Sequence, residues 1–125
     1  MSAPHFRLAG TVLGTPDPRG LASFYQQLLG WKVTDEGDDW LTLQPDDHGT
    51  GLSFQLEVFH REATWPGGPE DQQMQMHLDL TVDDIEAGVE RAVRLGARLS
   101  DHQPDRRTCP VLIDPAGHPF CLFLP

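Results

Sequence analysis

The sequence is poor in cysteine and in basic residues. Its two cysteines, Cys109 and Cys121, are too few for a disulfide framework and lack zinc-binding spacing, and they suit a reducing compartment. Nine Lys and Arg against nineteen Asp and Glu give a formal net charge of −10, which argues against binding to nucleic acid or to an anionic membrane surface. A cationic small molecule is compatible with this charge.

Long hydrophobic runs are also missing. No apolar stretch approaches the roughly 20 residues of a membrane span, and the first residues lack the basic and apolar regions of a secretory signal. We therefore expect a cytoplasmic protein. A length of 125 residues with 38% hydrophobic content is typical of one compact domain with its own core.

The pattern of apolar residues in the first half predicts a strand, a helix and three further strands. The first strand covers residues 8–14. Asp17 is expected to cap the helix, with Pro18 at its first position and Gly30 at its end. Turn residues separate the remaining strands, which are expected at 31–34, 40–44 and 52–59.

The second half repeats this order. Alternation at period two predicts a strand over residues 76–82. Asp83 with Glu86 resembles a capping box, and the helix that follows uses apolar positions at Ile85, Val89, Ala92 and Val93 before Gly96 stops it. Further strands are expected at 97–100, 108–113 and 119–124.

The chain is therefore βαβββ twice within one domain, residues 1–125. The modules span about 7–60 and 75–125, and a polar, Pro/Gly-rich connector covers 61–74. The helix ends set the repeat at 66 residues, whereas the strand starts align better at 67, and this difference decides which side chains share a face. Because each helix has one apolar stripe, it must cover one face of its own sheet.

Alternation along the strands separates a helix-side layer from an open face. The expected helix-side layer consists of Leu41, Leu43, Phe54, Leu56, Val58, Leu78, Leu80, Val82, Phe120, Leu122 and Leu124. The intervening residues face the other way, and the candidate ligand-binding residues among them are Trp40, Gln55, Glu57, Phe59, His77, Asp79, Cys121 and Phe123. Aromatic walls with a few polar groups suit a small organic ligand, either cationic or aromatic.

The polar candidates have structural as well as functional interpretations. His77 either hydrogen-bonds a neighbour, contacts a ligand or binds a metal. A pair with Asp79 would favour the protonated imidazole, which could serve as a general acid, so both are candidate catalytic residues. Cys121 has no activating neighbour in sequence and is interpreted as an inert small hydrophobe. Trp65-Pro66 is interpreted as a loop anchor or, alternatively, as a lid over a ligand.

The chain resembles the vicinal oxygen chelate superfamily, also called the glyoxalase/bleomycin resistance/dioxygenase superfamily. The resemblance covers about residues 7–124 and is carried by the segments at 24–31, 77–84, 95–97 and 114–120. Within the superfamily, the chain is similar to a glyoxalase-like subgroup common in actinomycetes. The resemblance implies an α+β fold in which two tandem βαβββ modules form a curled mixed sheet around a cleft. In this superfamily the cleft is completed either within one chain or across a two-fold dimer, and the residues do not decide between these; we expect a symmetric homodimer.

Metal-dependent members of this superfamily place one ligand on the first strand of each module and one on the last. On this sequence the four positions fall at about Gly10, Gln55, His77 and Cys121, and a one-residue slip of the first strand would replace Gly10 by Thr11. Only His77 is an undoubted ligand type. Together with Cys121 it gives two ligands, whereas a catalytic zinc site needs three. We therefore expect no metal and no cofactor.

Three functions are compatible with these observations, and the sequence alone does not decide whether the chain is an enzyme. The first is metal-independent binding of a small molecule in the cleft, as in bleomycin resistance proteins, and the missing metal ligands favour it. The second is a glyoxalase-type lyase, isomerase or dioxygenase that uses a divalent metal or acid–base chemistry by His77 and Asp79. The third is protein association with no ligand at all.

Overall fold

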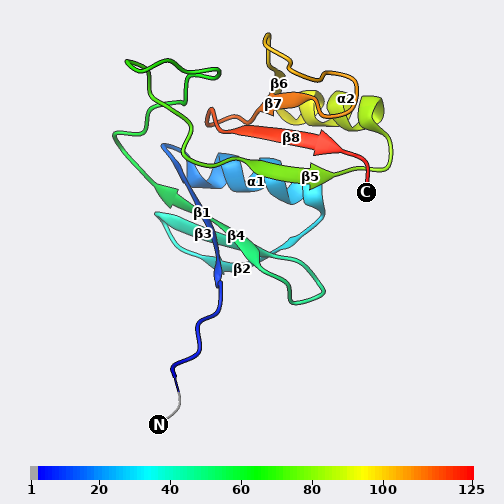
Figure 1. The fold of residues 1–125 in the computed structure, drawn as a ribbon. Coiled ribbons are helices and arrows are strands. Elements are labelled where there is room, and N and C mark those ends of the chain that lie inside the picture. Colours follow the sequence, from blue (N-terminus) through cyan, green and yellow to red (C-terminus); the bar gives the residue numbers. More distant parts are fainter. Residues whose placement is uncertain (1–2) are drawn as a thin grey trace. The chain divides into compact units, whose positions relative to one another are not determined.

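The computed structural model describes residues 3–125, which form two units that divide after Leu56. Each unit contains one helix and one four-stranded sheet (Figure 1). In the described part of the chain, no helix is long and apolar enough to cross a membrane. The two βαβββ modules expected from the sequence are therefore present.

The first unit is built on one mixed sheet. Its elements, in chain order, are β1 (Gly10–Thr15), α1 (Pro18–Leu29), β2 (Lys32–Glu36), β3 (Trp40–Gln44) and β4 (Gly51–Leu56). The strand order is β1-β4-β3-β2, with β1 parallel to β4 and the other pairs antiparallel. Helix α1 packs against β1, β3 and β4, so it covers one face of the sheet.

Helix α1 begins and ends where the sequence predicts. The Asp17 carboxylate accepts a hydrogen bond of 3.0 Å from the Gly20 N–H, and Pro18 occupies the first turn, where no N–H is needed. At the other end Gly30 adopts a φ of 73°, and its N–H donates to the Gln26 carbonyl at 2.8 Å. A left-handed residue of this kind is accessible to glycine without steric cost.

The core of the first unit confirms the predicted alternation in β3 and β4. The Tyr25 ring of α1 stacks on Phe54 at a centroid distance of 5.8 Å, so Phe54 faces the helix. Phe54 pairs with Leu41, and Leu52 pairs with Leu43, which places all four in the buried layer. Their neighbours on the open face are Trp40, Thr42, Ser53 and Gln55.

The second unit repeats the topology. Its elements are β5 (Leu78–Thr81), α2 (Ile85–Leu95), β6 (Arg98–Leu99), β7 (Val111–Ile113) and β8 (Pro119–Phe123). The strand order is β5-β8-β7-β6, with β5 parallel to β8, and α2 packs against β6 and β8. Residues 57–77 of this unit contain neither helix nor strand.

Close packing of α2 shows which side chains of the second sheet face the helix. A Cβ added to Gly88 of α2 would lie 2.9 Å from Val82 Cγ2 and 3.3 Å from Leu122 Cδ1, so both side chains reach the helix backbone. Phe120 and Leu112 are fully buried in the same layer. The predicted helix-side positions of Val82, Phe120 and Leu122 are therefore confirmed.

The hairpin between β7 and β8 is fixed by a buried carboxylate. Asp114 is 3% exposed, and its Oδ1 accepts hydrogen bonds from the Ala116 N–H at 2.8 Å and the His118 N–H at 3.0 Å. Gly117 supplies the positive φ of 89° that the turn requires. The Asp-Pro-Ala-Gly-His segment therefore forms the turn of the β7–β8 hairpin.

A one-residue difference in helix length explains the two repeat periods. The capping residues Asp17 and Asp84 lie 67 residues apart, whereas Gly30 and Gly96 lie 66 apart, because α2 has 11 residues and α1 has 12. The first strands therefore align at 67. Thr11 pairs with Leu52 of the helix-side layer, so Gly10, and not Thr11, faces away from α1.

Several predicted element boundaries were wrong, and two of them have a clear physical reason. The cap of α2 is Asp84, whose Oδ1 accepts from the Ala87 N–H at 3.0 Å, and not Asp83. Strand β7 begins at Val111 instead of residue 108, because the segment before it forms a turn in which the Cys109 N–H donates to the Asp105 carbonyl. Both errors shift an end by one to three residues and leave the element order intact.

Three predicted core residues and two predicted open-face residues were also misplaced. Strand β4 ends at Leu56, because its neighbours β1 and β3 provide no partner beyond that residue, and Glu57, Val58 and Phe59 lie outside the strand. Val58 is consequently 71% exposed. Val93 of α2 and Leu124, which follows the end of β8, are also exposed rather than part of the core.

The buried Tyr25–Phe54 stack predicts that Phe→Ala substitutions at two positions have very different effects on the free energy of unfolding. Phe54→Ala should lower the free energy of unfolding by about 3 to 5 kcal/mol, because it removes a fully buried ring from the contact with Tyr25. Phe59→Ala is the matched control and should change it by less than about 0.5 kcal/mol, since that ring is 92% exposed. Urea unfolding measures both, and equal losses would contradict the assigned layers.

Candidate functional site

The parallel pair β5–β8 brings several predicted site residues onto one face. Strands β5 and β8 lie side by side (Figure 1). Asp79 pairs with Cys121, and Thr81 pairs with Phe123, on the side of the sheet opposite Leu122. Cys121 and Phe123 are half-buried, whereas Asp79 is exposed. This helix-free surface, defined by His77, Asp79, Thr81, Cys121 and Phe123, is called the second open face below.

His77 and Asp79 form an ion pair on this face. His77 precedes β5 by one residue, and two residues along a strand lie on the same side. Its Nε2 lies 3.1 Å from Asp79 Oδ1, and the two side chains are 41% and 55% exposed. An ion pair this exposed adds little to stability, about 0 to 1 kcal/mol, and both groups are accessible to a ligand.

Cys121 is a protonated thiol at neutral pH. Burial raises the pKa of its thiol to about 12, and the neighbouring Cys109 thiol and Asp79 carboxylate act in the same direction. Since the thiolate is the nucleophile, a thiol of this kind is a poor one. The raised pKa supports the interpretation of Cys121 as an unreactive side chain in the absence of a metal.

These groups converge on a small volume. One ligand atom each from His77, Asp79 and Cys121 lies within 4.8 Å of the others. The site thus offers an imidazole nitrogen, a carboxylate oxygen and a sulfur to an incoming group. Such an arrangement can bind a cation, orient a polar ligand or exchange a proton between the imidazole and a substrate.

Cys109 lies near Cys121 and was not among the predicted site residues. Its thiol contributes to the raised pKa of the Cys121 thiol. Val111 pairs with Cys121 across the β7–β8 hairpin, and Cys109 lies two residues before Val111, in the turn that precedes β7.

The open face of the first sheet carries a hydrogen-bonded row. Trp40 Nε1–H donates to Thr42 Oγ1 at 2.9 Å, and Thr42 Oγ1 lies 2.8 Å from Ser53 Oγ. Gln55 is the cross-strand partner of Trp40 and is exposed. The predicted pair Trp40 and Gln55 therefore shares one face, with the half-buried indole beside a side-chain amide.

The residues at the superfamily's four ligand positions do not fit a metal centre of that kind. Gly10 faces away from α1 but has no side chain, and a Cβ there would lie 3.2 Å from the Gly51 carbonyl oxygen, tighter than an ordinary contact. Gln55 offers only an amide, a poor ligand beside His nitrogen or carboxylate oxygen. The first unit thus supplies no strong donor at either position.

Glu57 and Phe59 are not placed by strand alternation. They lie in a turn after β4, in which the His60 N–H donates to the Glu57 carbonyl at 3.1 Å. Phe59 is 92% exposed. Their prediction as lining residues assumed that the strand continued to residue 59, and that premise was wrong.

The segment at 57–77 is anchored within the second unit. His60 Nε2 lies 2.7 Å from the Ala116 carbonyl oxygen, and the His60 and His118 rings are 5.2 Å apart. The Trp65 ring lies 5.3 Å from that of His102, and the Trp65–Pro66 peptide bond is cis. These contacts favour the interpretation of Trp65-Pro66 as a loop anchor.

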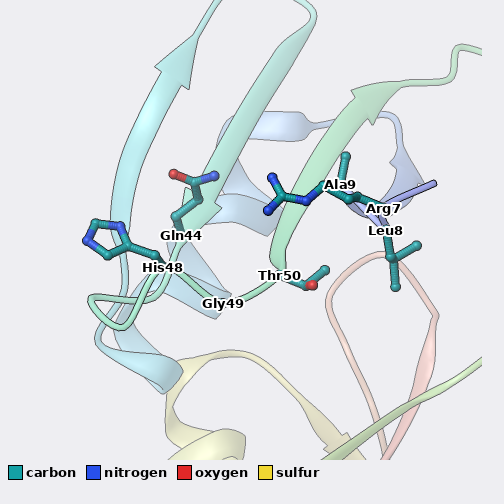
Figure 2. A pocket seen from close by; sticks show the side chains of 7 residues that line it. All are labelled: Arg7, Leu8, Ala9, Gln44, His48, Gly49 and Thr50. Carbon is teal, nitrogen blue, oxygen red and sulfur yellow. The ribbon is translucent and has the colours of Figure 1, made fainter. Parts of the chain in front are cut away.

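The first unit also contains a shallow pocket of about 430 Å³ (Figure 2). The Arg7 side chain extends toward Gln44, whereas His48 points away from both. The lining residues are all exposed and comprise Arg7, Leu8, Ala9, Gln44, His48, Gly49 and Thr50. None of the eight candidate ligand-binding residues lines this pocket.

Solved structures with the same fold include a bleomycin resistance determinant and two enzymes. A glyoxalase/bleomycin resistance protein/dioxygenase family enzyme from Burkholderia phytofirmans is 20% identical, with 92% of this chain and 95% of that chain covered and a TM-score of 0.68. A bleomycin resistance determinant encoded on transposon Tn5 is 22% identical, with coverage of 95% and 98% and a TM-score of 0.61.

A third structure, the trypanothione-dependent glyoxalase I of Leishmania major, is 18% identical, with 96% and 87% covered and a TM-score of 0.66. No curated protein matches the chain significantly. At these identities the structural neighbours show the shared α+β fold and not a shared activity. The sequence model of the glyoxalase-like domain matches residues 10–123, nearly the whole chain, and the chain therefore belongs to the glyoxalase-like domain family.

Proposed function

We propose that this chain is a binding protein for a small organic ligand with a cationic group, and that it needs no metal ion to bind it. The exposed His77–Asp79 pair on the second open face carries the proposal. An accessible carboxylate attracts a cation, and the adjacent imidazole donates or accepts a hydrogen bond that orients it. Phe123, on the neighbouring strand, offers apolar and aromatic contact area.

The chemistry of the first sheet supports independence from metal. Gly10 provides no ligand atom, and the open face there presents an indole, hydroxyls and an amide. These groups bind organic molecules through stacking and hydrogen bonds, and Trp40 is a good surface for a cation or an aromatic ring. We propose Trp40 and Gln55 as ligand contacts of the first unit.

The second candidate function is catalysis by a glyoxalase-type lyase or isomerase. The distance of 3.1 Å between His77 Nε2 and Asp79 Oδ1 favours it, because the carboxylate can orient the imidazole for proton transfer with a substrate. The chain's own groups would then hold and move the proton. The symmetric homodimer expected from the resemblance stays a prediction, which sedimentation equilibrium tests.

Binding of a cationic ligand should depend on Asp79. A thermal-shift screen of chelator-treated protein with cationic glycopeptide antibiotics, aromatic amines and their neutral analogues should select cationic compounds. A bound ligand at about 100 times its Kd stabilises the native state by about 2.7 kcal/mol and so raises the Tm.

The control for this screen is a matched charge change. Asp79→Asn should weaken binding of a selected compound by about two- to fivefold, as expected for one exposed charge pair. Asp38→Asn removes a charge from an exposed turn of the first unit and should leave the Kd unchanged. Equal effects of the two substitutions, or selection of anionic compounds, would contradict the proposed site.

Independence from metal predicts that a chelator does not weaken binding of the selected compound. Calorimetric titration with and without chelator measures this, because every proposed contact comes from the chain itself. A loss of about tenfold or more in affinity after chelation, restored by a divalent metal, would instead identify a metal-dependent site.

A further inference from the structure

The shallow pocket of the first unit lies at the end of the sheet where β1 and β4 begin and β3 ends (Figure 2). Because β1 and β4 are parallel, their first residues, Gly10 and Gly51, are paired there. Strand β3 runs antiparallel to β4 and finishes at the same end with Gln44. The segment before β1 and the turn before β4 therefore meet, and the lining comes from the first unit alone.

The lining of this pocket is positively charged, although the chain as a whole is strongly acidic. Arg7 is one of the seven lining residues, and none of the seven is Asp or Glu. Within residues 3–125, no carboxylate lies within 4.0 Å of the Arg7 guanidinium, whereas Arg19 and Arg106 each form an ion pair with a glutamate. The Arg7 guanidinium is therefore available to an anion from solution.

The two aspartates of the turn between β3 and β4 are bound to other groups. Asp46 Oδ1 lies 3.5 Å from Lys32 Nζ, and Asp47 Oδ1 accepts a hydrogen bond of 2.8 Å from the Gly49 N–H. Neither aspartate lines the pocket. The turn thus contributes no carboxylate that would compete with a ligand for Arg7.

We propose that this pocket binds a small organic monocarboxylate, and that the Arg7 guanidinium binds its carboxylate group. A guanidinium donates two parallel N–H bonds in the geometry that a carboxylate accepts. One charge on the ligand matches the single guanidinium, whereas a phosphate dianion would add an unbalanced charge to a chain of net charge −10. The volume of about 430 Å³ lies within the range of about 300 to 1,000 Å³ that small-molecule pockets occupy.

The other lining residues offer contacts to the rest of such a ligand. The Arg7 side chain extends toward the side-chain amide of Gln44, and both groups donate hydrogen bonds (Figure 2). Leu8, which is 75% exposed, and Ala9 offer apolar surface that a hydrocarbon group would remove from water. This site is independent of the proposed function, because it shares no residue with the second open face and selects the opposite charge.

Benzoate and benzamide test the proposal, because they differ in charge and little in shape. Amide NMR spectra of the isotope-labelled 125-residue chain are recorded during a titration with each compound at millimolar concentrations. We expect benzoate to shift the signals of residues 7–9, 44 and 48–50 in a saturable way. Benzamide should bind about fivefold more weakly, as expected from the loss of one exposed charge pair. Equal affinities, or benzoate shifts confined to other residues, would overturn the proposal.

Charge-matched substitutions identify the residue that binds the carboxylate. Arg7→Gln should weaken benzoate binding by about fivefold, and Arg7→Lys should restore part of the loss, because an ammonium keeps the charge without the paired N–H donors. Arg91→Gln removes an exposed positive charge from α2 and should leave the Kd unchanged within about twofold, since salt screens a distant charge. Equal losses in Arg7→Gln and Arg91→Gln would contradict a specific role of Arg7. Circular dichroism confirms that each variant is folded.

A second variant tests the same contact without removing Arg7. Gln44→Glu places a carboxylate on the side chain that the guanidinium approaches and should weaken benzoate binding by about fivefold or more. Gln26→Glu, on the exposed side of α1, adds the same charge elsewhere in the first unit and should have less than half of that effect. Equal effects of these two substitutions would count against the pocket.

Inorganic phosphate separates an organic carboxylate site from a general oxyanion site. We expect phosphate to compete with benzoate only weakly, because it has no hydrocarbon group to contact Leu8 and Ala9. Tighter binding of phosphate than of benzoate would overturn the proposed ligand class. Benzoate carries no cationic group, so its failure to bind leaves the proposed binding of a cationic compound untouched, and the converse also holds.

Discussion

Parallel pairing of β5 with β8 is the constraint on which the candidate site depends. This register sets Asp79 beside Cys121 and leaves Leu80 beside Leu122 in the layer under α2. A slip of one residue would expose the half-buried apolar side chains of β5, Leu78 and Leu80, to solvent. The hydrophobic layer therefore determines where the polar groups lie, although it makes no contact with a ligand.

The two units share this architecture and differ in what their open faces carry. In the first, Trp40, Thr42 and Ser53 form a neutral hydrogen-bonded row, and Gly10 places no side chain on that face. In the second, the corresponding first strand carries His77 and Asp79, which form an exposed ion pair. A repeated fold thus preserves helix-side packing while the open faces diverge, as expected when function is determined by the site.

Much of this arrangement could be predicted from sequence, because period-two alternation is strong where one face is buried. Phe54, Phe120 and Leu122 were assigned to the buried layer correctly for that reason. The placement of His77 and Asp79 on the opposite face followed from the same alternation. The same alternation misplaced Phe59. A strand ends where its partner strands end, and this position cannot be deduced from the residues of the strand itself.

Contacts between segments were harder to predict than faces. The approach of Cys109 to Cys121 depends on the β7–β8 register, and the His77–Asp79 distance depends on side-chain rotamers. The cap of α2 shifted to Asp84 because two adjacent aspartates are equally good caps by composition, and only the backbone selects one. In each case, information beyond the local pattern decided the outcome.

Amide NMR spectra of isotope-labelled protein, recorded with increasing amounts of a cationic compound, would locate its binding site. If the compound binds as proposed, the shifts concentrate on His77, Asp79, Thr81 and Cys121. Shifts confined to residues 7–9 and 44–50, around the shallow pocket of the first unit, would contradict the account.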